Sequence, residues 1–276
     1  MSSKSKPFHK VLILVIASRD EAYDEMTRLW KSFMNTELPH VRSFLVYADP
    51  TVSGTELRGD DDDVLVHGCV ESLVPGIFRK TNAAIQYCEE HFAYEYILRT
   101  NLSSFIVLRR LLSFLETHPK IQCAGPFYVL PEGPKGEEEK RLVKEILKTN
   151  VDQFFFLHGA CMLLSRSCVL YYLDALEKTS VAVVERLPDD VAMGALLHRV
   201  NKQYLERWVC TRPCTRDEIP SSPDVFHFRN RVDDSTYRHN SKTTRQVDIE
   251  NLAMQVAWSQ SLPHHFRQSS GLIFLC

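Results

Sequence analysis

The sequence predicts a single α/β domain built on a mostly parallel, twisted sheet with helices on both faces. The run VLILVIAS at residues 11–18 is continuous and rich in β-branched residues, which is typical of a strand buried on both faces. Helical and strand patterns then alternate along the chain, the order that builds parallel sheets. A length of 276 residues, with 44% hydrophobic and 25% charged residues, is ordinary for one globular domain of this class.

The first part of the chain shows this alternation clearly. Residues 19–35 place Met26, Leu29, Trp30 and Phe33 at helical spacing, with acidic residues in the first turn. Two strands are expected at 42–49 and 63–68, and the loop between them is rich in Pro, Gly and Asp.

The middle of the chain holds the segment that matters most for function. A helix is expected over 79–92, and a strand over 93–100 runs into Asn101-Leu102-Ser103. A further helix is expected over 104–118, with Ser103 or Ser104 as its N-cap. The remaining elements are strands over 120–130 and 152–165 and helices over 136–148, 166–177 and 247–262.

Composition and charge exclude several classes of partner. A formal net charge of −2 gives no electrostatic footprint for nucleic acid. The apolar run after the short polar N-terminus is too short for a membrane span and lacks a signal-peptide cleavage site. We therefore expect a cytoplasmic protein with a flexible N-terminus over 1–10, one domain over 11–262 and a tail over 263–276.

The cysteines predict no disulfide framework and no zinc site. The eight cysteines form no Cys-x-x-Cys pair, and most lie inside apolar runs. Reduced, buried thiols with a structural role are expected.

Polar residues follow the predicted strands at the sheet edge where α/β proteins bind ligands. The candidate segments are the loops after residues 17, 48, 99 and 164 and the turn near 188. They carry Ser18 and Arg19, Asp49, the segment from Arg99 through Thr100 to Ser103, and Asp189 with Asp190.

The pair Asp189-Asp190 has two interpretations. It follows Pro188 and opens a helix, where acidic side chains interact favourably with the helix dipole. One carboxylate at the sheet edge is also well placed to act as a general base toward a sugar hydroxyl.

Three other segments carry residue types that suit a metal, a phosphate or a modification. If FHFRNR is extended, His227, Arg229 and Arg231 share one face and suit a diphosphate or a phosphate-bound metal, although a surface strand with scattered basic residues fits equally well. The acids at 60–63 lie in a loop and are expected to be solvated rather than to bind metal. Asn101-Leu102-Ser103 matches a glycosylation sequon, which a cytoplasmic chain does not use.

Four segments together resemble the GT-A nucleotide-sugar glycosyltransferases, in particular the β-1,3-galactosyltransferase-like branch. The segment 78–116 is similar to the helix with Lys-Thr near its start and the strand ending Lys/Arg-Thr-Asp-x-Asp-x-Phe. FFLHGACMLLSR resembles that branch's Gly-x-Gly/Ala-Tyr-hydrophobic-Ser segment, and LPDDVAMGALL resembles its Glu-Asp-Val-x-x-Gly motif. FHFRNR lies where these enzymes often place a late His.

The resemblance implies a GT-A-like fold over about residues 11–230, a UDP-sugar donor and a glycan or glycoprotein acceptor. It implies that Asp190, beside Asp189, is the base of an inverting transfer of xylose, galactose or an N-acetylhexosamine, and that His227 contacts phosphate or metal. The donor-binding residues that it implies are Ser18, Arg19, Asp49, Lys80, Arg99, Thr100, Asn101, Leu102, Ser103, His158, Gly159, Ala160 and Arg229.

The chain departs from this family at the metal-binding acids. Asn101-Leu102-Ser103 stands where the family has Asp-x-Asp, whose acids help a divalent cation, Mn²⁺ or Mg²⁺, neutralise the leaving diphosphate. Three arrangements remain open: looser metal binding through Ser103, ligation by Asp190 or His227, or replacement of the ion by Arg and Lys side chains.

Because this motif is degenerate, two hypotheses compete with that of an active glycosyltransferase. A decayed GT-A domain would bind nucleotide sugar or glycan without turnover, against which the surviving Asp189-Asp190 pair argues. A phosphohydrolase would need a second acidic cluster at a strand end. A stand-alone chain with this motif is similar to the glycosyltransferases with which large algal viruses build capsid glycans, xylosyltransferases among them, which would place it in the host cytoplasm.

Overall fold

The computed structural model describes residues 5–19, 21–34, 38, 40–59, 63–210, 219, 222–231 and 244–261. Its centre is an eight-stranded sheet in the order β11-β7-β10-β5-β1-β2-β4-β3. The strands of this sheet are β1 Phe8–Ile16, β2 Val41–Ala48, β3 Thr55–Arg58, β4 Val64–His67, β5 Ala93–Asn101, β7 Cys123–Gly125, β10 Cys161–Ser165 and β11 Lys202–Tyr204.

The middle of the sheet is parallel, as the sequence predicts. Strands β5, β1, β2 and β4 run in one direction, whereas β10 and β3 run antiparallel to their neighbours β5 and β4. The order of strands reverses beside β1, because β2 lies on one side of it and β5 on the other. An open sheet of this kind binds ligands next to such a reversal, at the carboxyl ends of its strands.

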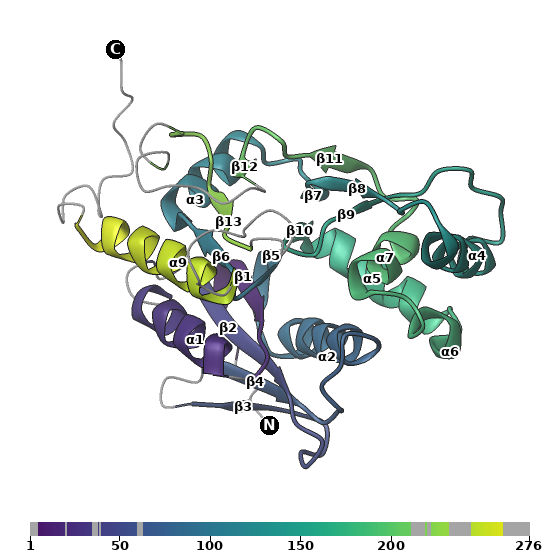
Figure 1. Ribbon diagram of the computed structural model, residues 1–276, viewed down its shortest axis with the longest axis horizontal. Helices are drawn as coiled ribbons and strands as arrows, with labels where there is room; N and C mark the ends of the chain where they lie inside the picture. Colours follow the sequence, from purple (N-terminus) through teal and green to yellow (C-terminus); the bar gives the residue numbers. More distant parts are fainter. Residues whose placement is uncertain are drawn as a thin grey trace.

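Helices cover both faces of the sheet, which confirms the predicted fold class (Figure 1). The helices α1, α3 and α9 lie on one face and α2, α4, α5, α6 and α7 on the other (Figure 1). Their bounds are α1 Glu21–Phe33, α2 Gly76–His91, α3 Leu108–Thr117, α4 Pro134–Leu147, α5 Arg166–Glu177, α6 Val181–Val184, α7 Asp189–Leu196 and α9 Thr244–Ser261.

The side chains of β1 show why the chain folds around this strand. Val11, Ile13 and Val15 pack into the core beneath α1, α3 and α9. The alternate residues, including Leu12 and Leu14, pack into the other core, beneath α2 and α7. A continuous apolar run therefore fills both cores, because successive side chains of a strand point to opposite faces.

Two predicted strands are interrupted near the edge of the sheet at which β1 and β5 end, which we call the functional edge. The expected strand over 152–165 is β9 Phe155–Leu157 followed by β10, with a turn at 158–160 between them. The expected strand over 120–130 is likewise divided into β7 and β8 Phe127–Val129, and β8 pairs with β9 in a separate two-stranded sheet. The strand β3 falls in a stretch predicted to be a loop.

The prediction that Ser103 or Ser104 caps the next helix is wrong. Residues Ser104–Ile106 form strand β6, and α3 begins after Val107, which makes no side-chain capping hydrogen bond. The hydroxyl groups of Ser103 and Ser104 instead donate to Oδ1 of Asn101, each at 3.0 Å. Strand formation prevails because β6 pairs with β13 His227–Arg229, which also pairs with β12 Val209–Cys210.

Two further sequence predictions bear on location and redox state. Among the residues that the structure describes, no helix has the length and hydropathy needed to cross a bilayer. The six described cysteines carry free thiols, and all but Cys210 are buried, as expected for structural residues. Cys214 and Cys276 lie outside the described residues, as does the predicted tail over 263–276.

Candidate functional site

A cavity of about 230 Å³ lies at the carboxyl ends of β1 and β5. The start of α7, the turn before β10 and the end of β13 contribute to its walls. Its lining residues are Ile16, Ser18, Tyr23, Leu73, Ile77, Arg99, Asn101, Leu102, Ser103, His158, Gly159, Ala160, Pro188, Asp189, Asp190, Arg229, Arg231 and Arg245.

The direction of β10 explains why the turn at 158–160 faces this cavity. Cys161, the first residue of β10, pairs with Thr100 near the carboxyl end of β5. Because β10 is antiparallel, its amino end reaches the functional edge and its carboxyl end points away. The loop after residue 164, predicted as a site segment from a parallel arrangement, therefore lies at the opposite edge, and the residues before β10 take its place.

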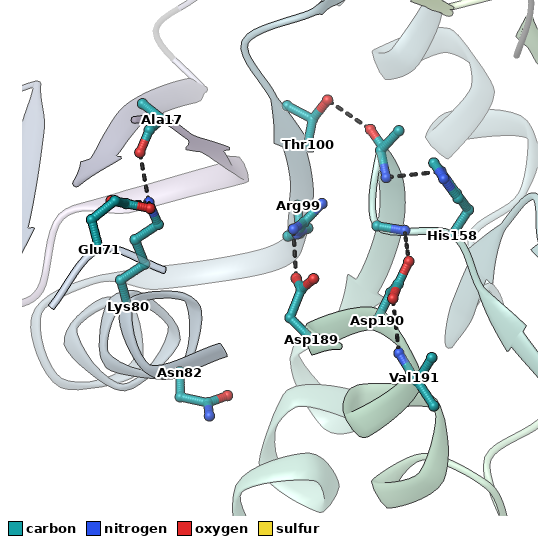
Figure 2. Close-up of polar contacts among 12 residues, drawn as sticks. Ala17, Glu71, Lys80, Asn82, Arg99, Thr100, His158, Asp189, Asp190 and Val191 are labelled. Atoms are coloured by element: carbon teal, nitrogen blue, oxygen red, sulfur yellow. Dashed lines mark hydrogen bonds and ion pairs between the residues drawn. The ribbon is translucent and has the colours of Figure 1, made fainter. Parts of the chain in front are cut away.

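A buried ion pair forms the floor of the cavity. Nη2 of Arg99, at the end of β5, donates to Oδ2 of Asp189 in the first turn of α7 at 2.5 Å (Figure 2). The two side chains are 5% and 11% exposed, so little water screens the pair. The contact fixes the start of α7 against β5.

Gly159 is required by this ion pair. A Cβ atom at residue 159 would lie 2.6 Å from Nη1 and 3.1 Å from Cζ of Arg99. The absence of a side chain lets the turn pass directly over the guanidinium group. His158 and Ala160 are thereby placed on either side of this close approach.

Asp190 turns away from Asp189 and toward the turn. Its Oδ2 accepts a hydrogen bond from the backbone N–H of Gly159 at 3.2 Å, and its Oδ1 accepts one from Val191 N–H at 3.0 Å (Figure 2). Burial and the neighbouring charge of Asp189 raise the pKa of Asp190 to about 6. The two acids thus differ: Asp189 is paired with a cation, and Asp190 has the pKa of a general base.

His158 lines the cavity as a neutral side chain. Its Nδ1 accepts the N–H of Ala160 at 3.1 Å, and its ring lies 4.3 Å from that of Tyr128, centroid to centroid. Burial, together with the positive charges of Arg229, Arg99 and Arg231, lowers the pKa of His158 to about 3. Arg229 and Arg231 therefore act electrostatically on the same space as His158.

The Asn101-Leu102-Ser103 segment lies in the cavity wall, where it is held by its own backbone and side chains. The carbonyl of Leu102 accepts the indole N–H of the buried Trp30 at 3.0 Å, which fixes α1 to the segment. The carbonyl of Ser103 accepts the N–H of Asn230 at 2.7 Å. Oδ1 of Asn101 accepts the hydroxyls of Ser103 and Ser104.

Lys80 does not line the cavity. Its Nζ is fully buried and donates to the carbonyl of Ala17 at 2.7 Å and to both carboxylate oxygens of Glu71 at 2.7 and 2.8 Å (Figure 2). Ser18, which does line the cavity, donates to the same Glu71 at 3.2 Å. Lys80 is therefore placed to position the end of β1, and its contact with a donor stays a prediction.

Arg19 and Asp49 lie beside the cavity without lining it. Arg19 is exposed and lies 5.6 Å above the ring of Tyr47 and 3.9 Å from Oδ2 of Asp49. The hydroxyl and N–H of Thr51 donate to Asp49 and lower the pKa of its carboxyl group. Both residues keep the positions predicted for them after β1 and β2.

His227 is separated from the cavity by the backbone of Ala160. It is fully buried, its Nε2 lies 2.8 Å from the carbonyl oxygen of Ala160 and burial lowers its pKa to about 4. Thr100, whose hydroxyl donates to the same carbonyl, is buried with it and does not line the cavity either. Of the predicted row, Arg229 and Arg231 line the cavity and His227 does not.

The predicted site residues omitted part of the lining. Arg245 comes from α9 and Tyr23 from α1, and the Arg245 guanidinium lies 5.7 Å from the Tyr23 ring centroid. Neither residue follows a strand end, so no local signal marks them. Leu73 and Ile77 add apolar surface from the segment before α2 and its first turn.

The donors in the cavity fit a resident divalent cation poorly. The part of the chain described by the structure contains no group of three or more His, Cys, Asp and Glu side chains able to hold a metal. Oδ1 of Asn101 is taken by two hydroxyls, and Asp189 is paired with Arg99. Of the acids at 60–63, the described Asp63 faces Lys31 at 3.3 Å, and the others lie outside the described residues.

Some solved structures of glycosyltransferases are similar to this chain. No family model and no curated protein matches the chain. Two structures of the galactosyltransferase LgtC, one with donor and acceptor sugar analogs and one of an active-site variant, each match with a TM-score of 0.44 and 11% identity, over 93% of this chain and 99% of theirs. The glycosyltransferase GlyE of Streptococcus pneumoniae TIGR4 matches with a TM-score of 0.40 and 11% identity, over 92% of this chain and 64% of its own. At this identity the chemistry of the site must be inferred from this chain's own side chains.

The ion pair beneath the cavity yields a stability prediction. Asp189→Ala leaves the Arg99 guanidinium buried without its partner, so we expect a loss of about 3 kcal/mol in the free energy of unfolding, measured by urea denaturation. The double variant Arg99→Met/Asp189→Leu, which removes both charges, is expected to recover most of that loss. A single variant as stable as the unmodified protein would contradict this role of the pair.

Proposed function

We propose that this chain is an inverting glycosyltransferase of the GT-A type, which moves a sugar from a nucleoside-diphosphate sugar to a hydroxyl group of a glycan or glycoprotein. The observation that carries the proposal is the carboxylate of Asp190, held by two backbone N–H groups in a cavity lined by arginines. A base and a set of cations in one cavity are what the reaction needs.

In the proposed reaction Asp190 takes the proton from the acceptor hydroxyl. The hydroxyl oxygen forms a bond to the anomeric carbon as the bond from that carbon to the diphosphate oxygen breaks, and the configuration inverts. The leaving nucleoside diphosphate carries away the bonding electron pair. The pKa of about 6 supports this role, because such a carboxylate is ionised at neutral pH yet more basic than an ordinary aspartate.

The cavity also offers surfaces suited to both substrates. Ile16, Tyr23, Leu73 and Ile77 give it an apolar part that suits a nucleobase. Tyr128, which is exposed and contacts the ring of the cavity residue His158, offers a ring face to the acceptor sugar outside the cavity. UDP is the preferred nucleotide, with xylose, galactose or an N-acetylhexosamine as the sugar.

The alternative function is binding of nucleotide sugar or glycan without turnover. The different contacts of the two acids favour catalysis. Asp189 is paired with Arg99, whereas Asp190, which forms no such ion pair with a described residue, accepts a backbone N–H, and a decayed site would not need this difference. The phosphohydrolase hypothesis needs a second acidic cluster at a strand end, and of the acids at 60–63 that the sequence offers for it, only Asp63 lies among the described residues.

Replacement of the proposed base gives the first test. Asp190→Asn keeps an oxygen that accepts from Gly159 and removes the basic group, so transfer from a UDP-sugar is expected to fall about 100-fold or more. The measurement is release of UDP and formation of glycosylated acceptor. The matched control Asp174→Asn, at an exposed acid of α5 paired with Lys178, should transfer at the unmodified rate.

Two outcomes would contradict this assignment. Unchanged transfer by Asp190→Asn would remove Asp190 as the base. Binding of UDP-sugar by the unmodified protein without transfer to any glycan of a broad panel would favour the non-catalytic alternative.

The melting temperature of Asp190→Asn should equal or exceed that of the unmodified protein, because burial disfavours the charged form of Asp190 in the folded state.

The pH dependence of transfer gives a second test. Asp190 acts as a base only when ionised, and its pKa is raised to about 6. The rate at saturating donor should therefore fall as the pH drops through about 6, and it should level off above that value. A rate that stays constant through this range would show that another group takes the proton.

A further inference from the structure

Lys80 is a buried charge that the proposed reaction does not use. Its side chain is 0% exposed, and its Nζ donates to three oxygens: the carbonyl of Ala17 at 2.7 Å and the two carboxylate oxygens of Glu71 at 2.7 and 2.8 Å (Figure 2). An ammonium group has three hydrogens, so these contacts can take all of them. Lys80 therefore lies behind the cavity wall, with its donors directed at the protein.

Glu71 links Lys80 to the cavity. Its Oε1 accepts the hydroxyl of Ser18 at 3.2 Å, and Ser18 lines the cavity just after the end of β1. Leu73 lines the cavity two residues after Glu71, from the segment 68–75 that connects β4 to α2. Leu73 is 69% exposed, so burial in a core does not set its position. One ion pair thus joins the two segments that carry Ser18 and Leu73.

The segment 68–75 also contacts the start of α2. The hydroxyl of Ser72 accepts the N–H of Gly76 at 2.9 Å, and the carbonyl of Ser72 accepts the N–H of Ile77 at 3.0 Å. A Cβ atom at residue 76 would lie 2.5 Å from the carbonyl oxygen of Val70, so glycine allows this close return of the chain. The segment is thus held against α2, and the ion pair adds its link to the end of β1.

The energetics of Lys80 favour a positioning role over a contribution to stability. Burial lowers the pKa of Lys80, and its hydrogen bonds with Glu71 act in the opposite direction. Replacement of a buried ion pair by apolar side chains is often neutral or stabilising, so such a pair is a poor source of stability. It does favour one geometry, because a buried charge must keep its partners.

We infer that Lys80 is a positioning residue for donor binding, which acts by holding Glu71 between two parts of the cavity wall. Those parts are Ser18 after β1 and Leu73 before α2. The inference rests on the proposed function, in which Leu73 belongs to the apolar part of the cavity that suits a nucleobase. It replaces the direct donor contact that the resemblance implies for Lys80 by an indirect role.

A double-mutant cycle on UDP binding tests this role. The Kd for UDP is measured by calorimetry for the unmodified protein, Lys80→Met, Glu71→Gln and the double variant, with Mn²⁺ in every titration so that any metal requirement is met equally. Each single replacement is expected to weaken binding about tenfold, and the double variant should bind no more weakly than the weaker single variant, because both residues act through one contact. A double variant whose loss equals the product of the two single losses would show that Lys80 acts on the nucleotide independently of Glu71, and would overturn the inference.

Steady-state transfer separates positioning from a general loss of structure. Both single variants should raise the KM for the UDP-sugar about tenfold and leave kcat within about twofold, because Asp190 lies on α7 and keeps its own contacts. A fall in kcat at unchanged KM would overturn the inference. The side chain of Glu71 is 37% exposed, so Glu71→Gln decides the question if the melting temperature shows that Lys80→Met does not fold.

The matched control is Lys178→Met. Lys178 follows α5, its side chain is 70% exposed and it pairs with Asp174, so this variant should bind UDP as the unmodified protein does. Unchanged UDP binding by both Lys80→Met and Glu71→Gln would overturn the inference and leave the proposed function standing. Failure of the unmodified protein to bind UDP would overturn the proposed UDP donor and, with it, the inference that rests on that donor.

Discussion

The buried ion pair between Arg99 and Asp189 is the contact on which the rest of the site depends. It joins the end of β5 to the start of α7, and it requires a glycine at 159 where the turn crosses the guanidinium group. Asp189 is paired with Arg99 there, and its neighbour Asp190 is the acid that we propose as the base. Adjacent residues at one helix start thus have different surroundings: Asp189 contacts a guanidinium group, and Asp190 accepts the backbone N–H of Gly159.

Much of the fold could be predicted from local patterns. The apolar run of β1 fills two cores, and the amphipathic patterns of α1 and α5 locate these helices within a residue or two. The strand-end rule also placed Arg99 at the site, because it lies near the carboxyl end of β5. Asp190 lines the same cavity although it follows helix α6 and not a strand. Periodicity and topology carry this information, and both can be inferred from the sequence.

The remaining features depend on contacts between distant segments. Ser104 begins a strand instead of capping a helix because β13, far later in the chain, supplies its pairing partner Arg229. Arg245 enters the cavity from the last helix, and the antiparallel direction of β10 moves the loop after residue 164 to the opposite edge. His227 is the opposite case. Its position in the motif predicts contact with a phosphate or a metal, but it is buried against the carbonyl of Ala160.

The central claim is that the arginine-lined cavity binds a sugar nucleotide next to Asp190. A crystal structure of the protein with UDP tests it most directly. The account predicts that diphosphate oxygens contact Arg229 and Arg231 and that the open position of the donor sugar adjoins the carboxylate of Asp190. A nucleotide bound elsewhere, or one whose diphosphate turns away from these arginines, would contradict it.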